Sequence, residues 1–213
     1  MIPADAGDSA APPQMTERAQ QKERTRERIL DSAARVLRTS GIGGASVAEV
    51  MKGAGLTVGG FYAHFTSKGD LIQETMRVAL AEQRDQLFAS VARAASTERI
   101  DRLLKAYLSR THRDTPETGC PLPAIVAEIA HADPAERDVF VRELDVHLRA
   151  IEEMTPKIEP MSTRTLSLGL LALLYGGLSL ARATRGTPIS DEVLRASRAF
   201  ARAACGIAQS KNK

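Results

Sequence analysis

The sequence predicts an all-α protein, and three observations carry this prediction. Ala and Leu dominate the apolar residues, and both favour helix over sheet. No stretch combines Val, Ile and Thr with the alternation of apolar and polar residues that a strand needs. Apolar residues recur instead at spacings of three and four, as on one face of a helix. A chain of 213 residues is long enough to bury a substantial core.

Composition and charge narrow the class of protein. Hydrophobic residues make up 43% and charged residues 26%, which is ordinary for a globular protein, and the net charge of +3 is compatible with a DNA partner. Two cysteines, Cys120 and Cys205, are too few for a disulfide framework or a cysteine metal cluster. Residues 1–15 are expected to be a disordered leader. The apolar stretch 166–180 is shorter than the roughly 20 residues of a membrane span, so we expect a buried helix in a cytoplasmic protein.

The first two helices are marked by periodicity and by capping residues. Apolar residues on one face predict a helix over about residues 18–38, and Gly41 is expected to end it. Ser46 and Glu49 have the spacing of a capping box, which predicts a short helix over residues 46–53.

A third short helix is expected directly after a tight turn. Gly55 can supply the positive φ that such a turn requires. Thr57 is a suitable cap for a helix that ends near His64. Three helices with tight connections then occupy residues 25–65, as in a helix-turn-helix unit.

A long helix follows, and several more complete the chain. Ser67 with Asp70 repeats the capping pattern and starts a helix over about residues 68–95, which we expect to be the only continuous connection between the first unit and the rest. Asp133 and Pro134 mark another helix start. The remaining helices are expected at about residues 98–110, 121–131, 134–154, 162–185 and 190–208.

Two consecutive glycines make the third helix unusual. The segment from Ser46 to Phe65 reads SVAEVMKGAGLTVGGFYAHF. Gly59 and Gly60 each cost about 1 kcal/mol relative to Ala inside a helix. Their lack of side chains would let the helix approach a phosphate backbone or base edges closely, which is a physical reason to keep them.

The stretch from Gly55 to Leu71, GLTVGGFYAHFTSKGDL, resembles the signature of the TetR (AcrR-like) family of bacterial transcriptional regulators. That signature has a glycine turn, a short recognition helix ending in Tyr-x-His-Phe, and then Ser-Lys and an acidic residue before Leu. The resemblance implies a DNA-binding domain over residues 21–81, with the helix-turn-helix motif at 46–65. It also implies a helical ligand-sensing and dimerisation domain over residues 82–213. Met51 departs from the family pattern, which usually has Ala beside the turn.

The resemblance further implies which residues contact DNA. Val58 and Gly59 match positions that face bases in the major groove. Lys68 matches a lysine that binds phosphate from the start of the next helix. Contacts to phosphates or flanking bases are implied for Ser46, Val47, Thr57, Gly60, Tyr62 and His64.

Several of these residues have a purely structural alternative. Tyr62 is alternatively a half-buried residue, and His64 a capping or packing residue, whereas Phe61 and Phe65 are expected in the core. The basic segment Lys22, Arg24, Arg26 and Arg28 alternates with acidic residues, so it is either a DNA-contacting arm or a solvated helix face.

The C-terminal domain is expected to dimerise. Apolar residues surround most of the helix over residues 162–185, so one face remains after it has packed in its own domain. The resemblance implies that this helix and residues 191–208 pair with their twins as a four-helix bundle. The alternative is a core helix of a monomer, but one headpiece alone would read too short a DNA site.

Residues 98–154 are then expected to form the pocket for an unidentified small-molecule effector. Cys120 is a candidate because the N-terminus of a helix can lower the pKa of a thiol, and its alternative is a small buried residue. Glu128 and His131 share one helix face and are further candidates. The His residues lack metal-ligand spacing, so neither a metal nor a cofactor is expected.

The sequence therefore predicts a ligand-inducible repressor that binds palindromic double-stranded operator DNA as a homodimer and is released by a small molecule. One alternative is a non-inducible structural DNA-binding protein, which would be more basic. The other is an all-α enzyme, but the sequence has no Gly-rich phosphate loop, nucleophile elbow or paired metal motif.

Overall fold

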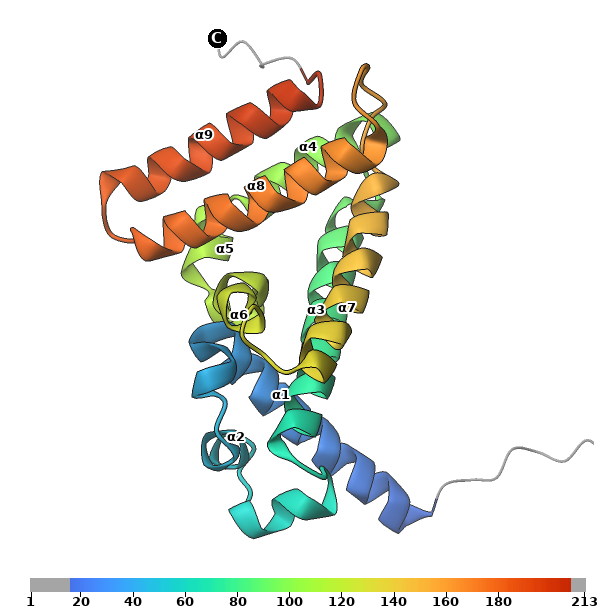
Figure 1. Cartoon of the computed structure of the whole chain (residues 1–213), viewed down its shortest axis with the longest axis vertical. Helices are drawn as coiled ribbons and strands as arrows, with labels where there is room; N and C mark the ends of the chain where they lie inside the picture. Colours follow the sequence, from blue (N-terminus) through green and yellow to red (C-terminus); the bar gives the residue numbers. More distant parts are fainter. Residues whose placement is uncertain (1–15, 208–213) are drawn as a thin grey trace, which may run out of the picture.

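The computed structural model describes residues 16–207, and every regular element within them is a helix, which confirms the predicted all-α class (Figure 1). The predicted leader, residues 1–15, lies outside the described residues. The α-helices are α1 (Glu17–Gly44), α2 (Val47–Gly53), α3 (Lys68–Ala92), α4 (Ser96–Tyr107), α5 (Arg110–Asp114), α6 (Leu122–Ile129), α7 (Pro134–Glu152), α8 (Thr163–Ala183) and α9 (Pro188–Ala204). Two 3₁₀ helices are η1 (Val58–Ala63) and η2 (Pro116–Thr118).

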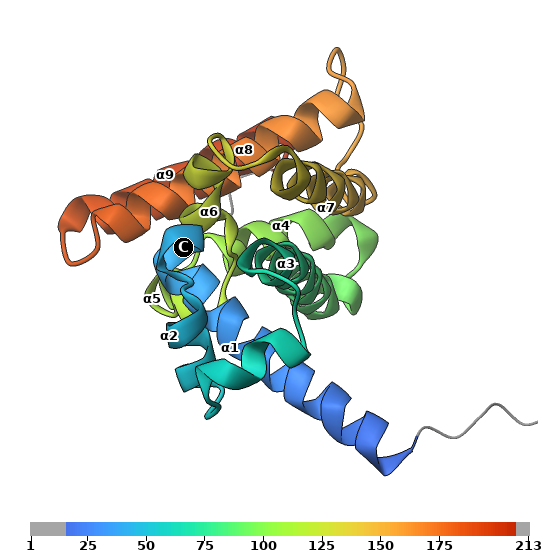
Figure 2. The same ribbon diagram turned by 60° about the horizontal axis from the view of Figure 1, so that its bottom comes forward.

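The molecule is elongated, with a small N-terminal unit at one end and the helix pair α8–α9 across the other (Figure 1). Helices α3 and α7 run side by side and join the two ends, while α6 packs on α1 near the middle. Figure 2 shows α8 and α9 lying alongside each other in the second view as well.

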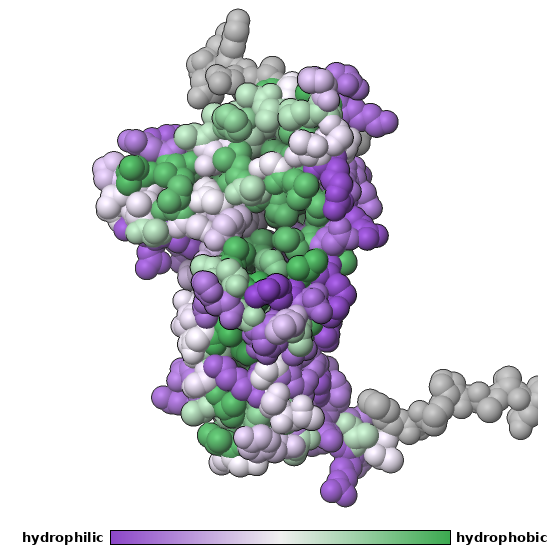
Figure 3. All heavy atoms as spheres, viewed as in Figure 1, coloured by the Kyte–Doolittle hydropathy of each residue, from purple (hydrophilic) through white to green (hydrophobic). Residues whose placement is uncertain are grey.

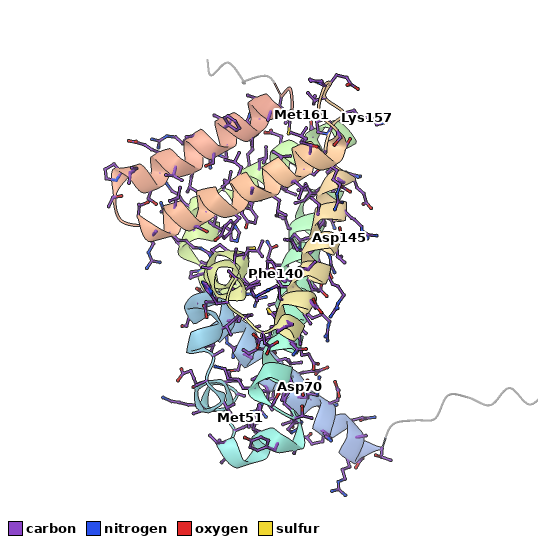
Figure 4. All side chains as sticks on the ribbon, viewed as in Figure 1. Met51, Asp70, Phe140, Asp145, Lys157 and Met161 are labelled. Carbon is purple, nitrogen blue, oxygen red and sulfur yellow. The ribbon has the colours of Figure 1, made fainter. Side chains whose placement is uncertain are left out.

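The N-terminal unit, which we call the headpiece, has its own apolar core. Side chains from α1, α2, η1 and the first turn of α3 form it, and Phe61 and Phe65 are among the largest of them. Met51, the residue that departs from the family pattern, lies fully buried in this core, which its flexible side chain can fit (Figure 4).

Local signals in the sequence account for most of the helix ends in the headpiece. Gly41 has a φ of 71° and breaks the regular helix inside α1, and Gly55 has a φ of 69° after α2. The hydroxyl of Ser46 accepts a 3.1 Å hydrogen bond from the backbone N–H of Glu49, as the capping pattern predicts. Ser67 accepts one in the same way, 3.0 Å long, from Asp70.

Several predictions about the helices are wrong in detail. The third element, η1, is a 3₁₀ helix rather than an α-helix, and Thr57 precedes it without capping it. The long helix α3 ends at Ala92, three residues earlier than predicted. The short elements α5 and η2 were not predicted, and α9 begins at Pro188 because proline is favoured in the first turn of a helix.

Helix α3 is not the only element that joins the two parts of the molecule. The larger apolar core, built mainly from α3 to α9, also contains Leu37 from α1. Helix α1 packs on α6 and η2 as well as on α3. The headpiece is therefore held to the rest of the chain by α1 and α3 together, which corrects the prediction of a single connection.

Candidate nucleic-acid interface

The residues after Gly55 form a continuous exposed surface on the headpiece. Thr57, Val58, Gly59, Gly60 and Tyr62 are all exposed. Val58 is 50% exposed and Tyr62 75% exposed, although both carry large apolar groups. The alternative that Tyr62 is half-buried is therefore wrong.

The opposite side of η1 holds this surface in place. Phe61 is completely buried, and its ring stacks on that of Phe65 with the centroids 5.7 Å apart. The ring of Tyr62 meets Phe61 edge-on at 5.1 Å. The two phenylalanines belong to the core, as predicted, and they orient the exposed side of η1 away from it.

The two glycines of η1 are not required by the fold. A Cβ at Gly59 would meet nothing within 4 Å, and one at Gly60 would make only an ordinary 3.8 Å contact with Cε of Met51. Neither glycine has a positive φ. By contrast, a Cβ at Gly53 would overlap the hydroxyl of Ser32. The pair Gly59–Gly60 thus exposes bare backbone where the protein itself has room for side chains.

Helix α2 contributes two further predicted residues. Ser46 is exposed at the position before the helix, and Val47 is half-buried as its first residue. The Ser46 hydroxyl oxygen already caps the helix, so its O–H remains to donate to an outside acceptor.

His64 follows η1 in a half-buried position. Its Nδ1 is buried and has no hydrogen-bond partner among the described residues. Burial lowers the pKa of His64, and the nearby positive charges of Lys22 and Arg26 lower it further. The imidazole is therefore neutral at pH 7. His64 and Lys22 line the same surface groove, which brings the N-terminal part of α1 next to the end of η1.

The basic segment of α1 divides into two pairs. Arg26 forms an ion pair with Glu74 and lies over the ring of Phe65, 4.8 Å from its centroid. Arg28 donates a 2.6 Å hydrogen bond to the backbone carbonyl of Ala54. These two residues stabilise the headpiece. The other two, Lys22 and Arg24, are exposed and make no ion pair within residues 16–207.

Lys68 is exposed at the first position of α3. The carboxylate of Asp70 accepts hydrogen bonds from the backbone N–H and the hydroxyl of Thr66, at 2.9 and 3.1 Å, and so fixes the start of this helix (Figure 4). Glu136 at the start of α7 is close enough for the charge of Lys68 to lower the pKa of its carboxyl, although burial raises that pKa on balance. Lys68 thus lies exposed at a fixed helix start, four residues after His64 in the chain.

The three predicted effector residues are not brought together. Cys120 is fully buried, and burial raises the pKa of its thiol, so the predicted lowering by a helix N-terminus is wrong. His131 is exposed, whereas Glu128 binds backbone N–H groups of α1. Within residues 16–207 no three His, Cys, Asp or Glu side chains are grouped as a metal site would need.

A cavity of about 360 Å³ that the sequence does not predict is lined by four arginines, Arg38, Arg113, Arg182 and Arg185. Only part of its lining comes from the predicted pocket region, residues 98–154. The arginines come from α1, α5, α8 and the turn after α8, and no local pattern in the sequence links such distant positions.

Comparisons with known proteins agree with this geometry. Residues 29–75 match the family model described as bacterial regulatory proteins, tetR family. Over 55 residues the chain is 42% identical to the HTH-type transcriptional regulator AcrR of Shigella flexneri, and this alignment covers only 26% of each protein.

Solved structures resemble the chain over most of its length. A TetR-family transcriptional regulator from Cytophaga hutchinsonii superposes with a TM-score of 0.72 at 20% identity, covering 93% of this chain and all of that one. A putative transcriptional regulator from Saccharomonospora viridis in complex with choline gives a TM-score of 0.66 at 20% identity, over 84% of this chain and 95% of that one. Residues 29–75 thus match the TetR family of bacterial regulatory proteins, and the chain as a whole shares the fold of the TetR-family regulator from Cytophaga hutchinsonii.

Proposed function

We propose that this protein is a transcriptional repressor rather than an enzyme, and that it binds a palindromic operator as a homodimer and releases it when a small molecule binds. The observation that carries the proposal is the exposed surface formed by residues 57–60 and Tyr62, in which the protein keeps two glycines that its own packing does not need. A helix without side chains at those positions can approach a nucleic acid closely.

The chemistry of the headpiece supports binding to duplex DNA. Lys68, Lys22 and Arg24 are exposed cations of the headpiece and suit phosphate contacts. Val58 offers only an apolar contact, such as one to a thymine methyl group. Direct readout of bases from η1 is therefore limited, and we propose that the shape of the DNA contributes to specificity.

The exposed apolar face of α8 and α9 supports dimerisation. Four large hydrophobic residues of this helix pair remain between 46% and 70% exposed: Leu168, Leu180, Ile189 and Phe200. Apolar side chains spread over α8 and α9 on the face shown in Figure 3. A largely apolar hollow of about 210 Å³ lies between the two helices, lined by residues that include Leu170 and Phe200. A second copy of the pair would cover this surface and place two headpieces on successive major grooves, about 34–36 Å apart.

Helix α8 is the one helix among the described residues whose length and composition would suffice to cross a membrane, and 39% of its most apolar window is buried. It packs on α4, α5, α6, α7 and α9. We propose that its remaining apolar face meets a second subunit and that the protein acts in the cytoplasm.

The experiment that tests the function is footprinting of the full-length protein on the DNA flanking its own gene, followed by fluorescence anisotropy on the protected site and on random DNA. A sequence-specific regulator should bind its site about 10³-fold or more tightly than random DNA at physiological salt. Equal affinities would overturn the proposal and favour a structural DNA-binding protein.

A further inference from the structure

The arginine-lined cavity lies where the headpiece meets the C-terminal domain. Helix α1 reaches it with Arg38, α5 with Arg113 and α8 with Arg182, while Arg185 follows the end of α8. Figure 1 shows the C-terminal end of α1 next to α6, with α5 and the end of α8 directly above. Within the described chain no Asp or Glu lines this cavity.

Three polar atoms of the residues that line this cavity are buried without a partner among the described residues. They are Nε of Arg38, Nε of Arg182 and Oγ of Ser179. The side chain of Arg38 is only 7% exposed, so water cannot readily replace a missing partner. All three atoms can donate hydrogen bonds, and leaving buried donors unpaired is unfavourable. The cavity therefore has spare donors for an acceptor group.

The positive charge of the cavity is only partly neutralised. Arg38 pairs with Glu82 at 2.8 Å, and Arg113 pairs with Asp114 and Asp191. These carboxylates bind the arginines from outside the lining of the cavity.

The other two arginines form no ion pair with a described carboxylate, although Glu117 and Asp114 lie near enough to act on Arg182 and Arg185, respectively, through their charge. Arg182 donates to the backbone carbonyls of His112 at 3.0 Å and Cys120 at 3.4 Å, and burial lowers its pKa. Neither Arg182 nor Arg185 makes an ion pair within the part of the chain that the structure describes. Two positive charges thus face one small cavity without a paired anion.

We propose that this cavity binds a small organic anion, whose carboxylate or phosphate group is held by Arg182, Arg38 and Ser179. Arginine forms strong bidentate hydrogen bonds with both kinds of group. Pro123, Ala124 and Ala183 also line the cavity and leave room for a short apolar part of the ligand.

The site would act as the effector site of the regulator, and this part of the inference rests on the proposed function. Arg38 belongs to the first helix of the headpiece, whereas Arg182 belongs to the helix whose exposed face is assigned to the dimer. An anion bound to both would fix the position of α1 relative to α8. The two headpieces must match the spacing of the two halves of the operator. A change in the position of α1 relative to α8 would therefore change the affinity for DNA.

Isothermal titration of the full-length protein with benzoate and with inorganic phosphate tests the site, at constant ionic strength and with uncharged benzamide as the control ligand. At least one anion should bind with a Kd below about 1 mM, and benzamide should not. Binding of benzoate alone assigns an organic carboxylate, and binding of phosphate alone assigns a phosphate group. Absence of binding by both anions, or equal binding of benzamide, would overturn the inference.

Variants show whether the anion uses this cavity. Arg182→Gln should weaken anion binding at least 10-fold, and Arg142→Gln, which removes an exposed arginine from α7, should leave it unchanged. Should Arg182→Gln fail to fold, Arg185→Gln removes a charge from an exposed side chain and should weaken binding about 3-fold. Unchanged binding in both cavity variants would place the anion elsewhere and refute the inference.

Operator binding separates this inference from the proposed function. If the protein binds its operator specifically but neither anion binds or changes that affinity, the anion site is refuted and the regulator stands. If an anion binds in a manner that depends on Arg182 but no specific DNA is bound, the site stands and the proposed function fails.

Discussion

The carboxylate of Glu128 on α6 accepts a 2.7 Å hydrogen bond from the backbone N–H of Gly43 near the end of α1, and its second oxygen accepts one of 3.2 Å from Ile42. The kink at Gly41 makes this contact possible, because its φ of 71° exposes these N–H groups to α6. A Cβ at Gly41 would overlap the Glu128 carboxylate. One side chain of the C-terminal domain thus holds the first helix of the headpiece.

Replacing Glu128 should therefore loosen the headpiece. Glu128→Ala leaves two N–H groups without their acceptor and should lower the free energy of unfolding by about 1–3 kcal/mol. Glu128→Gln keeps one neutral acceptor and should cost less. Urea denaturation at pH 7.5 measures both values. A Glu128→Ala variant as stable as the native protein would show that the contact contributes nothing to stability.

Gly59→Ala should separate DNA binding from folding. The new Cβ has free space, so the melting temperature should stay the same or rise slightly. On the operator it would meet the DNA that Gly59 lets the backbone approach, and we expect a loss of affinity of about 10-fold or more, equivalent to at least 1.4 kcal/mol.

Gly69→Ala is the matched control for this variant. A Cβ at Gly69 would also make only ordinary contacts, with Ser67 at 3.6 Å and with Glu136 of α7 at 3.9 Å. The new methyl group would therefore lie toward α7 of the C-terminal domain. Its melting temperature and operator affinity should both stay close to the native values. If Gly59→Ala binds the operator as tightly as Gly69→Ala does, η1 does not approach the DNA as proposed.

Lys68→Ala should weaken binding similarly on operator and on random DNA, because phosphate contacts carry little sequence information. The slope of log K against log salt should fall by about one unit, as one phosphate contact is lost. Lys157→Ala removes the same charge at the far end of the molecule and should change neither quantity (Figure 4). A changed base preference with an unchanged salt slope would refute this role for Lys68.

The features that the sequence predicts well are local ones. A capping serine and the residue it caps lie three positions apart, so Ser46 and Ser67 mark the starts of α2 and α3 directly. The positive φ of Gly55 follows from a similarly short pattern. The 3₁₀ form of η1 could not be predicted, because in six residues the apolar spacings of the two helix types are nearly the same.

The features that the sequence does not reveal depend on contacts between distant residues. Arg26 alternates with acidic residues like its neighbours, yet only the fold brings it to Glu74 and over Phe65. The residue types of Glu128 and Cys120 make both of them candidates for an effector site. One instead binds the backbone of α1, and the other is enclosed in the core. The arginines of the cavity meet only because α1, α5 and α8 pack together.

Phe200→Glu should convert the protein from dimer to monomer. Phe200 on α9 is 70% exposed in the single chain, and burying a charge in its place at an apolar interface without a partner is strongly unfavourable. Light scattering at micromolar concentration should give a mass near 46 kDa for the native protein, about twice the 23.0 kDa of one chain, and near 23 kDa for the variant. Val141→Glu, at a 56% exposed valine of α7, should remain dimeric. A native mass of one chain would exclude the dimer.

Two buried histidines should make the protein less stable as the pH falls below about 6.5. Burial lowers the pKa of His112 and that of His147 to about 4, from an ordinary value of 6.5. Between these values the unfolded chain binds more protons than the folded one, so the free energy of unfolding decreases as the pH is lowered. The contribution of the two neutral histidines to the free energy of unfolding is fully present above pH 6.5, the ordinary pKa of histidine, and is lost progressively toward pH 4.

The geometry of His112 gives a direct reason for its neutral form. Its Nδ1 donates to the carbonyl oxygen of Tyr107 at 2.8 Å, and its Nε2 accepts from the backbone N–H of Cys120 at 2.9 Å. Protonation of Nε2 would break the second bond. His147 is 3% exposed, and the positive charge of Arg84 adds to the effect of burial in lowering its pKa.

Urea denaturation at pH 7 and pH 5 tests this prediction, with an expected loss of about 2 kcal/mol for each histidine over that interval. Carboxylates with a lowered pKa, such as that of Asp191, lose their charge only near or below pH 4 and do not contribute there. His64, whose pKa burial also lowers, acts in the same direction. His147→Leu removes one of the two groups whose pKa falls to about 4 and should reduce the difference between the two pH values by about 2 kcal/mol. His131→Gln changes an exposed histidine and should leave the difference as it is. Equal stability at pH 7 and pH 5 in the native protein, or the same decrease in His147→Leu as in His131→Gln, would contradict the assignment of the pH dependence to these buried side chains.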